Sequence, residues 1–504
     1  MRWSFKAKPI DLSTAGIRVV VMNEADAQDM DVYAMDRVRI WKEESSLTAV
    51  VDLTKTFVKP GELGLFYEAY TNLGVKAGED IQVEPIEKPV SVSYIRKKLD
   101  GIKLTQEEIE KIIEDLMEDE LTEFELSAFV TATYIRGLDE DETVYLTKAI
   151  VNSGEVLDLG KERVYDKHSI GGVPGNRTTM IIVPIVASAG LTIPKTSSRA
   201  ITSPAGTADV MEVLAPVSLD KEEIERVVKK ANGCIVWGGA VNLAAADDKL
   251  IRIRHPLSLD PRGMLLASIM AKKKAVSATD VIIDIPTGEG AKVKTREEAL
   301  ELGENFKLIG NRLGMHIKVL LTDGDHPIGR AIGPALEAKE ILRILNNEPV
   351  SQDLTEKSAI LSGILLEMSG KANRGEGRDV AMRIIKSGKA LAKLKEIIEL
   401  QGGDPDIKPD DIKIGEISET ITSQKSGRIE HINNKAISAI ARAAGAPKDK
   451  EAGIYMHVEE GDKVKVGSPL FTLYAKKQRK LEQAISLYEK LNPIRFERIL
   501  LEIG

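Results

Sequence analysis

The stretch Asp166-Lys-His-Ser-Ile-Gly-Gly-Val-Pro-Gly-Asn-Arg-Thr-Thr179 is the most informative part of this 504-residue chain. Its glycines permit backbone conformations that other residues avoid, so amide N–H groups can turn toward an anion. If Thr178 and Thr179 open the apolar segment Met180–Ala189 as a helix, its first amides face the same anion. The stretch therefore predicts a phosphate-binding loop that leads into a helix of an α/β domain.

An ordinary Gly-rich turn between a strand and a helix would contain the same glycines. Lys167, His168 and Ser169 favour phosphate binding instead, because they place a cation and hydrogen-bond donors beside flexible backbone. By their place in the loop, Lys167, Ser169 and Thr179 are the expected ligands of an inorganic phosphate. His168 could transfer a proton, or it could only hydrogen-bond phosphate or backbone.

Four regions separate on sequence pattern. We expect a β-rich barrel over 1–87, a helical domain over 88–160 joined by about 243–276, an α/β domain over 161–415, and a C-terminal α+β domain over 416–504. Expected strands are Ile17–Met22, Arg37–Trp41, Asp80–Val83, Gly233–Trp237, Val281–Ile285, His316–Thr322, Gly427–Ile432 and Gly453–Val458. Expected helices are 105–118, 123–136, 141–153 and Ala436–Ala444, the first two opened by capping boxes at Thr105 with Glu108 and Thr122 with Glu125.

Composition fits a soluble enzyme of the cytoplasm and excludes few other classes of protein. The net charge of -8 argues against general attraction to nucleic acid, and a single cysteine, Cys234, excludes an internal disulfide. No signal-peptide run or membrane-spanning stretch is present, since the longest apolar stretch is short and contains Pro184. The charged fraction of 29% fits a heat-adapted surface, such as that of a thermophile.

A second loop, Lys195-Thr-Ser-Ser-Arg-Ala-Ile-Thr-Ser-Pro-Ala-Gly-Thr-Ala-Asp209, is rich in hydroxyl groups and contains Arg199 as a fixed cation. Taken alone, it could be a solvated loop. It follows the first loop after one apolar helix, however, and two such loops fit a ligand that carries both phosphate and sugar.

The ordered motifs Lys167-His-Ser-Ile-Gly-Gly-Val173, Ser198-Arg199, Ala205-Gly-Thr-Ala-Asp209 and Ala267-Ser-Ile-Met-Ala-Lys272 resemble those of the thymidine and pyrimidine nucleoside phosphorylase family. The resemblance runs from about residue 90 to the C-terminus. It implies a helical domain and a large α/β domain across a cleft, and cleavage of a glycosidic bond by inorganic phosphate.

This sequence differs from the nucleoside branch at three places, and these differences bear on which substrate the chain binds. Ile170 stands where that branch has threonine, Val173-Pro-Gly-Asn176 has an extra residue, and Thr202-Ser-Pro-Ala205 replaces a His-containing stretch. These loops and the extra N-terminal domain resemble the archaeal-type AMP phosphorylases. That branch converts a nucleoside 5'-monophosphate and phosphate to free base and ribose 1,5-bisphosphate. For this chain we expect AMP as substrate, and also CMP and UMP.

This resemblance implies nucleotide contacts and a proton donor at defined positions. The implied contacts are Gly172, Ser198, Arg199, Ala200, Ile201, Thr202, Ser203, Thr207, Ser268 and Lys292. Lys272 lies one helical turn beyond Ser268 and could reach base or ribose, whereas at least two of the three lysines 272–274 are expected in solvent. Asp260 is the implied acid, although Asp followed by Pro261 is also a common helix start.

No cofactor or metal is expected, because phosphate is a co-substrate and Asp323-Gly-Asp-His326 fits a polar loop better than a metal site. The expected partners are small-molecule substrates, with no nucleic acid and no membrane, and a homodimer or larger homo-oligomer that uses the apolar stripe of 105–153. Three alternatives stay open: a thymidine or pyrimidine nucleoside phosphorylase, a phosphoribosyltransferase with a Mg²⁺ site, and a non-enzymatic nucleotide sensor.

Overall fold

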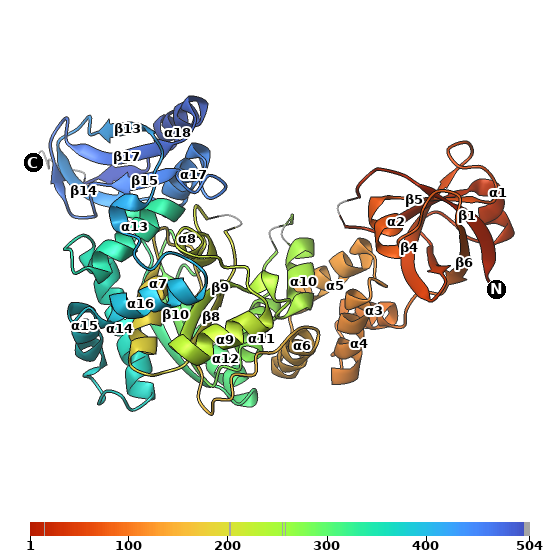
Figure 1. Cartoon of the computed structure of the whole chain (residues 1–504), viewed down its shortest axis with the longest axis horizontal. Coiled ribbons are helices and arrows are strands. Elements are labelled where there is room, and N and C mark those ends of the chain that lie inside the picture. The colour runs from red at the N-terminus through yellow and green to blue at the C-terminus, as the bar shows by residue number, and fades with distance from the viewer. Residues whose placement is uncertain (15, 201–202, 255, 258, 498–504) are drawn as a thin grey trace, which may run out of the picture. The chain divides into compact units, whose positions relative to one another are not determined.

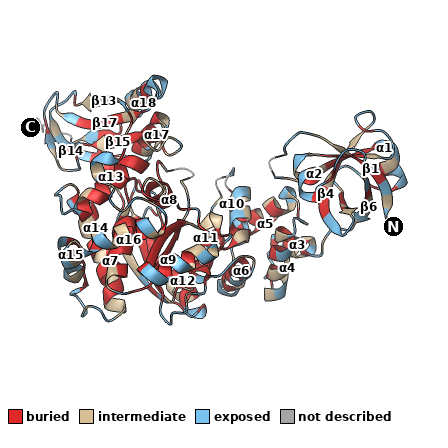
Figure 2. Ribbon diagram, in the orientation of Figure 1, coloured by how far each residue is buried: buried red, intermediate tan, exposed pale blue. Residues whose placement is uncertain are grey.

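The computed structural model in Figure 1 describes residues 1–14, 16–200, 203–254, 256–257 and 259–497. Buried apolar side chains gather in separate clusters in the N-terminal barrel, the α/β region and the C-terminal region (Figure 2). Within the described residues, no helix has both the length and the apolar character needed to cross a membrane.

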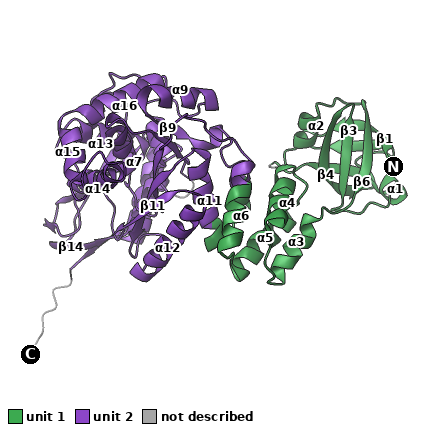
Figure 3. Cartoon of the chain, turned by 90° about the horizontal axis from the view of Figure 1, so that it is seen from below, with its two compact units in different colours: residues 1–149, 249–264 green, residues 150–248, 265–504 purple. Residues whose placement is uncertain are grey.

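The chain divides into two compact units (Figure 3). Unit 1 comprises Met1–Ala149 and Lys249–Met264, and unit 2 comprises Ile150–Asp248 and Leu265–Gly504. The division falls inside three helices, α6 (Glu140–Asn152), α10 (Ala245–Arg254) and α11 (Arg262–Ala275).

Unit 1 begins with a closed β-barrel of strand order β1-β5-β2-β4-β3-β6, which confirms the predicted barrel. Its elements are β1 (Trp3–Pro9), β2 (Val19–Asn23), α1 (Glu24–Asp29), β3 (Arg37–Lys42), β4 (Ser45–Thr54), β5 (Glu62–Leu65), α2 (Tyr67–Leu73) and β6 (Asp80–Ile86). Val38 and Ile40 alternate along β3 and are fully buried, as inward-facing barrel positions should be.

Four helices follow the barrel in sequence: α3 (Ser91–Leu99), α4 (Gln106–Met117), α5 (Glu123–Arg136) and α6. The capping boxes of Thr105 with Glu108 and of Thr122 with Glu125 are both formed, so the helices begin where the sequence predicted. Helix α3 was not predicted. Its N-cap residue, Val90, makes no side-chain cap hydrogen bond and Val92 is β-branched, so the local helix signal is weak, and packing against α4 and α5 supplies the missing stabilisation.

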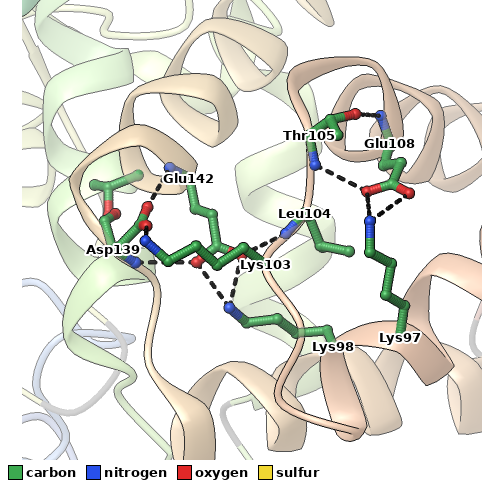
Figure 4. A network of polar contacts seen from close by, with 9 residues as sticks. Lys97, Lys98, Lys103, Leu104, Thr105, Glu108, Asp139 and Glu142 are labelled. Atoms are coloured by element: carbon green, nitrogen blue, oxygen red, sulfur yellow. Dashed lines mark hydrogen bonds and ion pairs between the residues drawn. The ribbon is translucent and has the colours of Figure 1, made fainter.

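A buried ion pair joins α3 to α6 (Figure 4). The Nζ of Lys98 lies 2.6 and 2.7 Å from the two carboxylate oxygens of Glu142, and both side chains are buried. The backbone N–H groups of Leu104 and Asp139 each donate to Glu142 at 3.0 Å. Three donors therefore converge on one buried carboxylate, which compensates its desolvation.

Unit 2 contains the α/β region. Its elements are β7 (Tyr165–Ser169), α7 (Thr178–Ser188), β8 (Ile193–Ser197), α8 (Thr207–Met211), α9 (Lys221–Ala231), β9 (Gly233–Trp237), η1 (Gly238–Ala240), β10 (Asp280–Thr287), α12 (Arg296–Arg312), β11 (His316–Asp323), β12 (Ala331–Ile332), α13 (Pro334–Leu345), α14 (Gln352–Met368), α15 (Gly377–Lys386) and α16 (Lys389–Leu400). Strands pair in parallel in the orders β11-β10-β7 and β8-β9, so the loops after β7, β8 and β10 leave from carboxyl ends of strands. Open α/β sheets bind ligands at that edge.

The C-terminal region consists of η2 (Pro409–Asp411), β13 (Ile417–Thr422), β14 (Gly427–Ile432), α17 (Asn434–Ala444), β15 (Gly453–Met456), β16 (Lys463–Val464), β17 (Pro469–Ala475), α18 (Gln478–Leu491) and β18 (Ile494–Phe496). One of its sheets has the order β12-β15-β17-β13 and therefore includes a strand from the α/β region. That shared sheet ties α13 to the C-terminal strands.

Candidate active site

The Gly-rich loop connects β7 to α7, and the helix begins at Thr178 as predicted. Gly172 has φ of +98°, and a Cβ there would lie 2.7 Å from the backbone N of Lys292. A side chain at this position would be strained and would also clash with backbone. The glycine therefore lets the first loop pack against the turn that follows β10.

Lys167 and Ser169 hold fixed positions at the start of the loop. The buried Lys167 donates from Nζ to Oγ1 of Thr178 at 2.8 Å and lies 3.9 Å from Asp284, and Ser169 donates to Asp284 at 2.9 Å. A further cation, Lys357 of α14, lies 3.3 Å from the same carboxylate. Asp284 thus organises two of the three predicted phosphate ligands.

Burial and charge shift the pKa values of this cluster. Burial lowers the pKa of Lys167 to about 8. Burial opposes ionisation of Asp284, but Lys167 and Lys357 hold its pKa below its ordinary value. At neutral pH the cluster therefore contains a carboxylate and two cations, and an anion that bound here would meet an excess of positive charge.

Asp166 precedes the loop and is fully buried, with two lysines that the loop sequence did not reveal. Lys195 lies 3.1 Å from Asp166, and Lys273 forms a short ion pair with it. Of the lysines 272–274, only Lys273 is buried, in this pair; Lys274 is exposed, and the partly exposed Lys272 is engaged as described below. Burial and these lysines together hold the pKa of His168 well below its ordinary value, so its imidazole is neutral at pH 7.

The second loop is closed by Asp209, whose carboxylate accepts the backbone N–H groups of Ala200 at 2.7 Å and Gly206 at 2.8 Å. Arg177 of the first loop donates to the backbone oxygen of Ala205 and pairs with the buried Glu337. One arginine therefore joins the two loops, which the sequence predicted only as neighbours.

The hydroxyl-bearing residues of the second loop are distributed along it. Thr207 is buried at the start of α8, Ser203 donates to the oxygen of Ala205 at 3.0 Å, and the backbone oxygen of Ser198 accepts from Ser197. The predicted contacts Ile201 and Thr202 lie outside the described residues.

Arg199 does not present a free guanidinium to a ligand. Both of its terminal nitrogens donate to Glu212 at 2.6 Å, and the guanidinium lies over the ring of Trp237 at 4.9 Å. A bidentate pair of this kind holds the arginine in one orientation. In this structure, then, Arg199 braces the second loop.

Ser268 and Lys272 lie on one face of α11, as their spacing predicted. Ser268 donates to Asp247 at 2.7 Å, and the Nζ of Lys272 lies 2.6 Å from the same carboxylate oxygen. Asp247 thereby orients both side chains.

Asp260 lies in unit 1, two residues before α11 begins. Its side chain is about half exposed and lies 3.4 Å from a guanidinium nitrogen of the buried Arg254. The side chain of Lys292 is exposed in the turn after β10, and its backbone N approaches Gly172.

Acidic groups near the loops are used in structural contacts. Asp323 and Asp325 accept backbone N–H groups of Asp325 and Glu289, and His326 lies 2.9 Å from Glu460. Among the described residues, the carboxylates of Asp115, Glu118 and Glu120 in unit 1 lie close enough together to ligate a metal. Lys111 is 3.0 Å from Asp115 and Arg39 pairs with Glu120, so two of the three carboxylates already have a cation as partner.

The candidate site residues that the sequence analysis missed are mainly buried charged side chains. Asp284 gave a signal, since it interrupts the apolar run Val281–Ile285 and a buried carboxylate needs partners. Lys357 and Lys273 gave none, because each meets its carboxylate only through packing of a helix on a strand.

Models of known protein families match three segments of the chain. Residues 92–154 match the helical bundle domain of the glycosyl transferase family, and residues 161–391 match its a/b domain. Residues 428–495 match the pyrimidine nucleoside phosphorylase C-terminal domain. An anthranilate phosphoribosyltransferase from Thermus thermophilus, 18% identical, superposes with a TM-score of 0.52 over 61% of this chain and 98% of its own, which shows a shared fold.

Full-length relatives carry the name AMP phosphorylase. The protein of Methanococcoides burtonii is 48% identical over 99% of this chain and 98% of its own length. The protein of Thermococcus sibiricus is 49% identical over 99% of this chain and 98% of its own length. The protein of Pyrococcus furiosus is 48% identical over 99% of each chain. The similarity therefore includes the N-terminal barrel as well as the domains shared with other nucleoside phosphorylases.

Proposed function

The chain belongs to the nucleoside phosphorylases of the glycosyl transferase family, and within them to the AMP phosphorylases, and we propose on this premise that it splits AMP with inorganic phosphate into adenine and ribose 1,5-bisphosphate. The observation that carries the proposal is the similarity to AMP phosphorylases over 99% of the chain. The braced pair of loops supports it, because AMP and phosphate together bring two anionic groups that need separate donors.

The reaction requires one bond to form and one to break. A phosphate oxygen attacks C1' of the ribose, the C1'–N bond breaks, and its electron pair goes to the base. Lys167, Ser169 and Thr179 bind the attacking phosphate in this proposal. Ser268, Lys272, Lys292, Gly172 and the loop 198–207 bind the nucleotide, and Asp260 donates a proton to the departing base.

His168 is the weaker candidate for the acid. Because burial and neighbouring lysines hold its pKa well below its ordinary value, its protonated form is scarce at neutral pH. A neutral imidazole can still donate one hydrogen bond to phosphate. We therefore assign hydrogen bonding to His168, and we assign proton transfer to Asp260 because the family resemblance implies it.

Base release is the direct test. The protein is incubated with AMP, CMP, UMP, thymidine or uridine, each with and without phosphate, and free base and sugar phosphate are quantified. Release from nucleoside monophosphates only when phosphate is present supports the proposal. Release only from thymidine or uridine would assign the chain to the nucleoside branch, and AMP binding without any product would make it a sensor.

A phosphoribosyltransferase is less well supported by the geometry. That reaction needs carboxylates available to a pyrophosphate-bound Mg²⁺, but Asp166 and Asp284 are each engaged by two lysines. Turnover that requires 5-phosphoribosyl pyrophosphate and Mg²⁺ would overturn this view.

We further propose that the protein acts on small molecules, is located in the cytoplasm and forms a homodimer or a larger homo-oligomer.

Replacing Lys167 by methionine is expected to raise the KM for phosphate about 10- to 100-fold, because a charge-assisted hydrogen bond contributes about 1.5–3 kcal/mol. In the unmodified protein, kcat/KM for phosphate should fall as pH rises through about 8, where Lys167 loses its proton. The cationic form binds the anion, so the loss lies on the alkaline side. Initial rates over a phosphate series at several pH values measure both effects.

The exposed Lys161→Met variant is the matched control and should retain the parent KM. A Lys167→Met variant with unchanged phosphate KM, or one that keeps the alkaline decline, would remove Lys167 from the phosphate site.

A further inference from the structure

A cavity of about 310 Å³ lies in unit 2 between α13 and the C-terminal sheet, apart from both loops of the candidate active site. One wall presents Lys339, Glu340 and Arg343 of α13, and the other presents Tyr455, His457 and Tyr474. Ligand sites begin at about 300 Å³, so this cavity reaches the lower end of their size range. Val350, Leu336 and Ile414 complete an apolar lining between the two walls.

The two cations of this cavity already converge on one anion. Lys339 lies 3.0 Å and Arg343 3.6 Å from the same carboxylate oxygen of Asp410, whose side chain is 84% exposed. These cations hold the pKa of Asp410 below its ordinary value. Because an exposed pair is weak and screened by water, a phosphate with more charge and more acceptor oxygens can displace the carboxylate.

The opposite wall is suited to a flat ring. The rings of Tyr455 and His457 meet edge to face with centroids 5.5 Å apart, and His457 is oriented by a 2.8 Å contact with Oγ1 of Thr472. The hydroxyl groups of the two tyrosines of this wall can serve a polar ring edge.

Glu340 is the one acidic group in the lining, and its charge is compensated inside the protein. It accepts hydrogen bonds from Ser351 and from the backbone N–H of Arg330, and burial raises its pKa to about 7. Its repulsion of a ligand anion near neutral pH is therefore weaker than that of a fully ionised carboxylate.

We propose that this cavity is a second, non-catalytic binding site for a nucleoside monophosphate, with the base against Tyr455 and Tyr474 and the phosphate on Lys339 and Arg343 in place of Asp410. The combination of an aromatic wall with two clustered cations selects for a ring and a phosphate on one molecule. Adenine and pyrimidine nucleotides share that chemistry.

The test is equilibrium dialysis of the full-length protein with labelled AMP. We expect a class of sites whose affinity rises about threefold in Asp410→Asn, because the competing carboxylate is gone, and falls at least tenfold in Lys339→Met. A gain of affinity cannot result from misfolding, and Asp410 is exposed, so the first variant keeps the test valid if the second is unstable. Neither residue lies in the catalytic proposal, so turnover of AMP should stay at the parent value in both.

Competition and a control complete the design. CMP and AMP as competitors identify the preferred base, whereas adenosine and inorganic phosphate should each compete at least tenfold more weakly than AMP. Lys395→Met, a partly exposed lysine that pairs loosely with Asp406, should change nothing. AMP binding that is unaffected by both Asp410→Asn and Lys339→Met would overturn the proposal, and so would equal competition by adenosine.

Discussion

The Asp260→Asn variant is expected to lose phosphorolysis of AMP by a factor of about 10² to 10⁴ in kcat, because an amide cannot protonate the departing base. AMP binding should change far less, since Asn keeps the size and most of the hydrogen bonding of Asp. Steady-state rates and equilibrium binding of AMP, measured on the same preparations, separate the two effects. Because Asp260 lies close to Arg254, a loss of activity could also come from a displaced arginine.

Arg254 would retain a hydrogen-bond acceptor in Asp260→Asn, so loss of activity would reflect the lost proton and not a displaced arginine. Asp406→Asn is the matched control, because its carboxylate is 93% exposed and lies outside both loops. An unchanged kcat in Asp260→Asn would remove this residue from the mechanism, and His168 would then be the next acid to test.

Replacing Glu142 by alanine is expected to destabilise the helices around it by about 3–5 kcal/mol, because Lys98 is left as a buried charge without its partner. The N–H groups of Leu104 and Asp139 lose their acceptor at the same time. A chain of several domains does not unfold in one step, so the measurement is hydrogen exchange of α3 and α6. Protection of these amides should fall by about 10² to 10⁴.

The double variant Lys98→Met with Glu142→Gln should recover much of that loss, because no charge is left buried and the amide oxygen still accepts a backbone N–H. Lys103→Met provides the control: this lysine lies 2.5 Å from Asp139 but its side chain is 78% exposed, so protection should not change. Equal protection in Glu142→Ala and the parent chain would show that water compensates Lys98.

Much of the fold could be predicted because its signals are local. The capping boxes at Thr105 and Thr122, the strand Gly233–Trp237 and the start of α7 each depend on residues within a few positions. Helix caps and positive φ angles are settled by neighbouring backbone groups, so a single sequence contains the information. The Lys-His-Ser-x-Gly-Gly loop belongs to the same class, and it pointed to the family.

The partners of charged side chains could not be predicted from local sequence. Arg199 was predicted to contact substrate, and no local pattern indicated that Glu212 would hold both of its terminal nitrogens. At least two of the lysines 272–274 were expected in solvent, and no local pattern indicated that Lys273 would pair with Asp166, 107 residues earlier in the chain.

By itself, the sequence predicted the barrel, the glycine-rich loop before α7 and the family, and it singled out Lys167, Ser169 and Ser268. Only the tertiary structure decided which charges neutralise one another: Lys357 and Lys167 on Asp284, Lys195 and Lys273 on Asp166, Arg177 on Glu337. The physical reason is distance along the chain. A buried charge needs a partner within a few ångströms, and sheet pairing and helix packing choose that partner from segments that no local pattern connects.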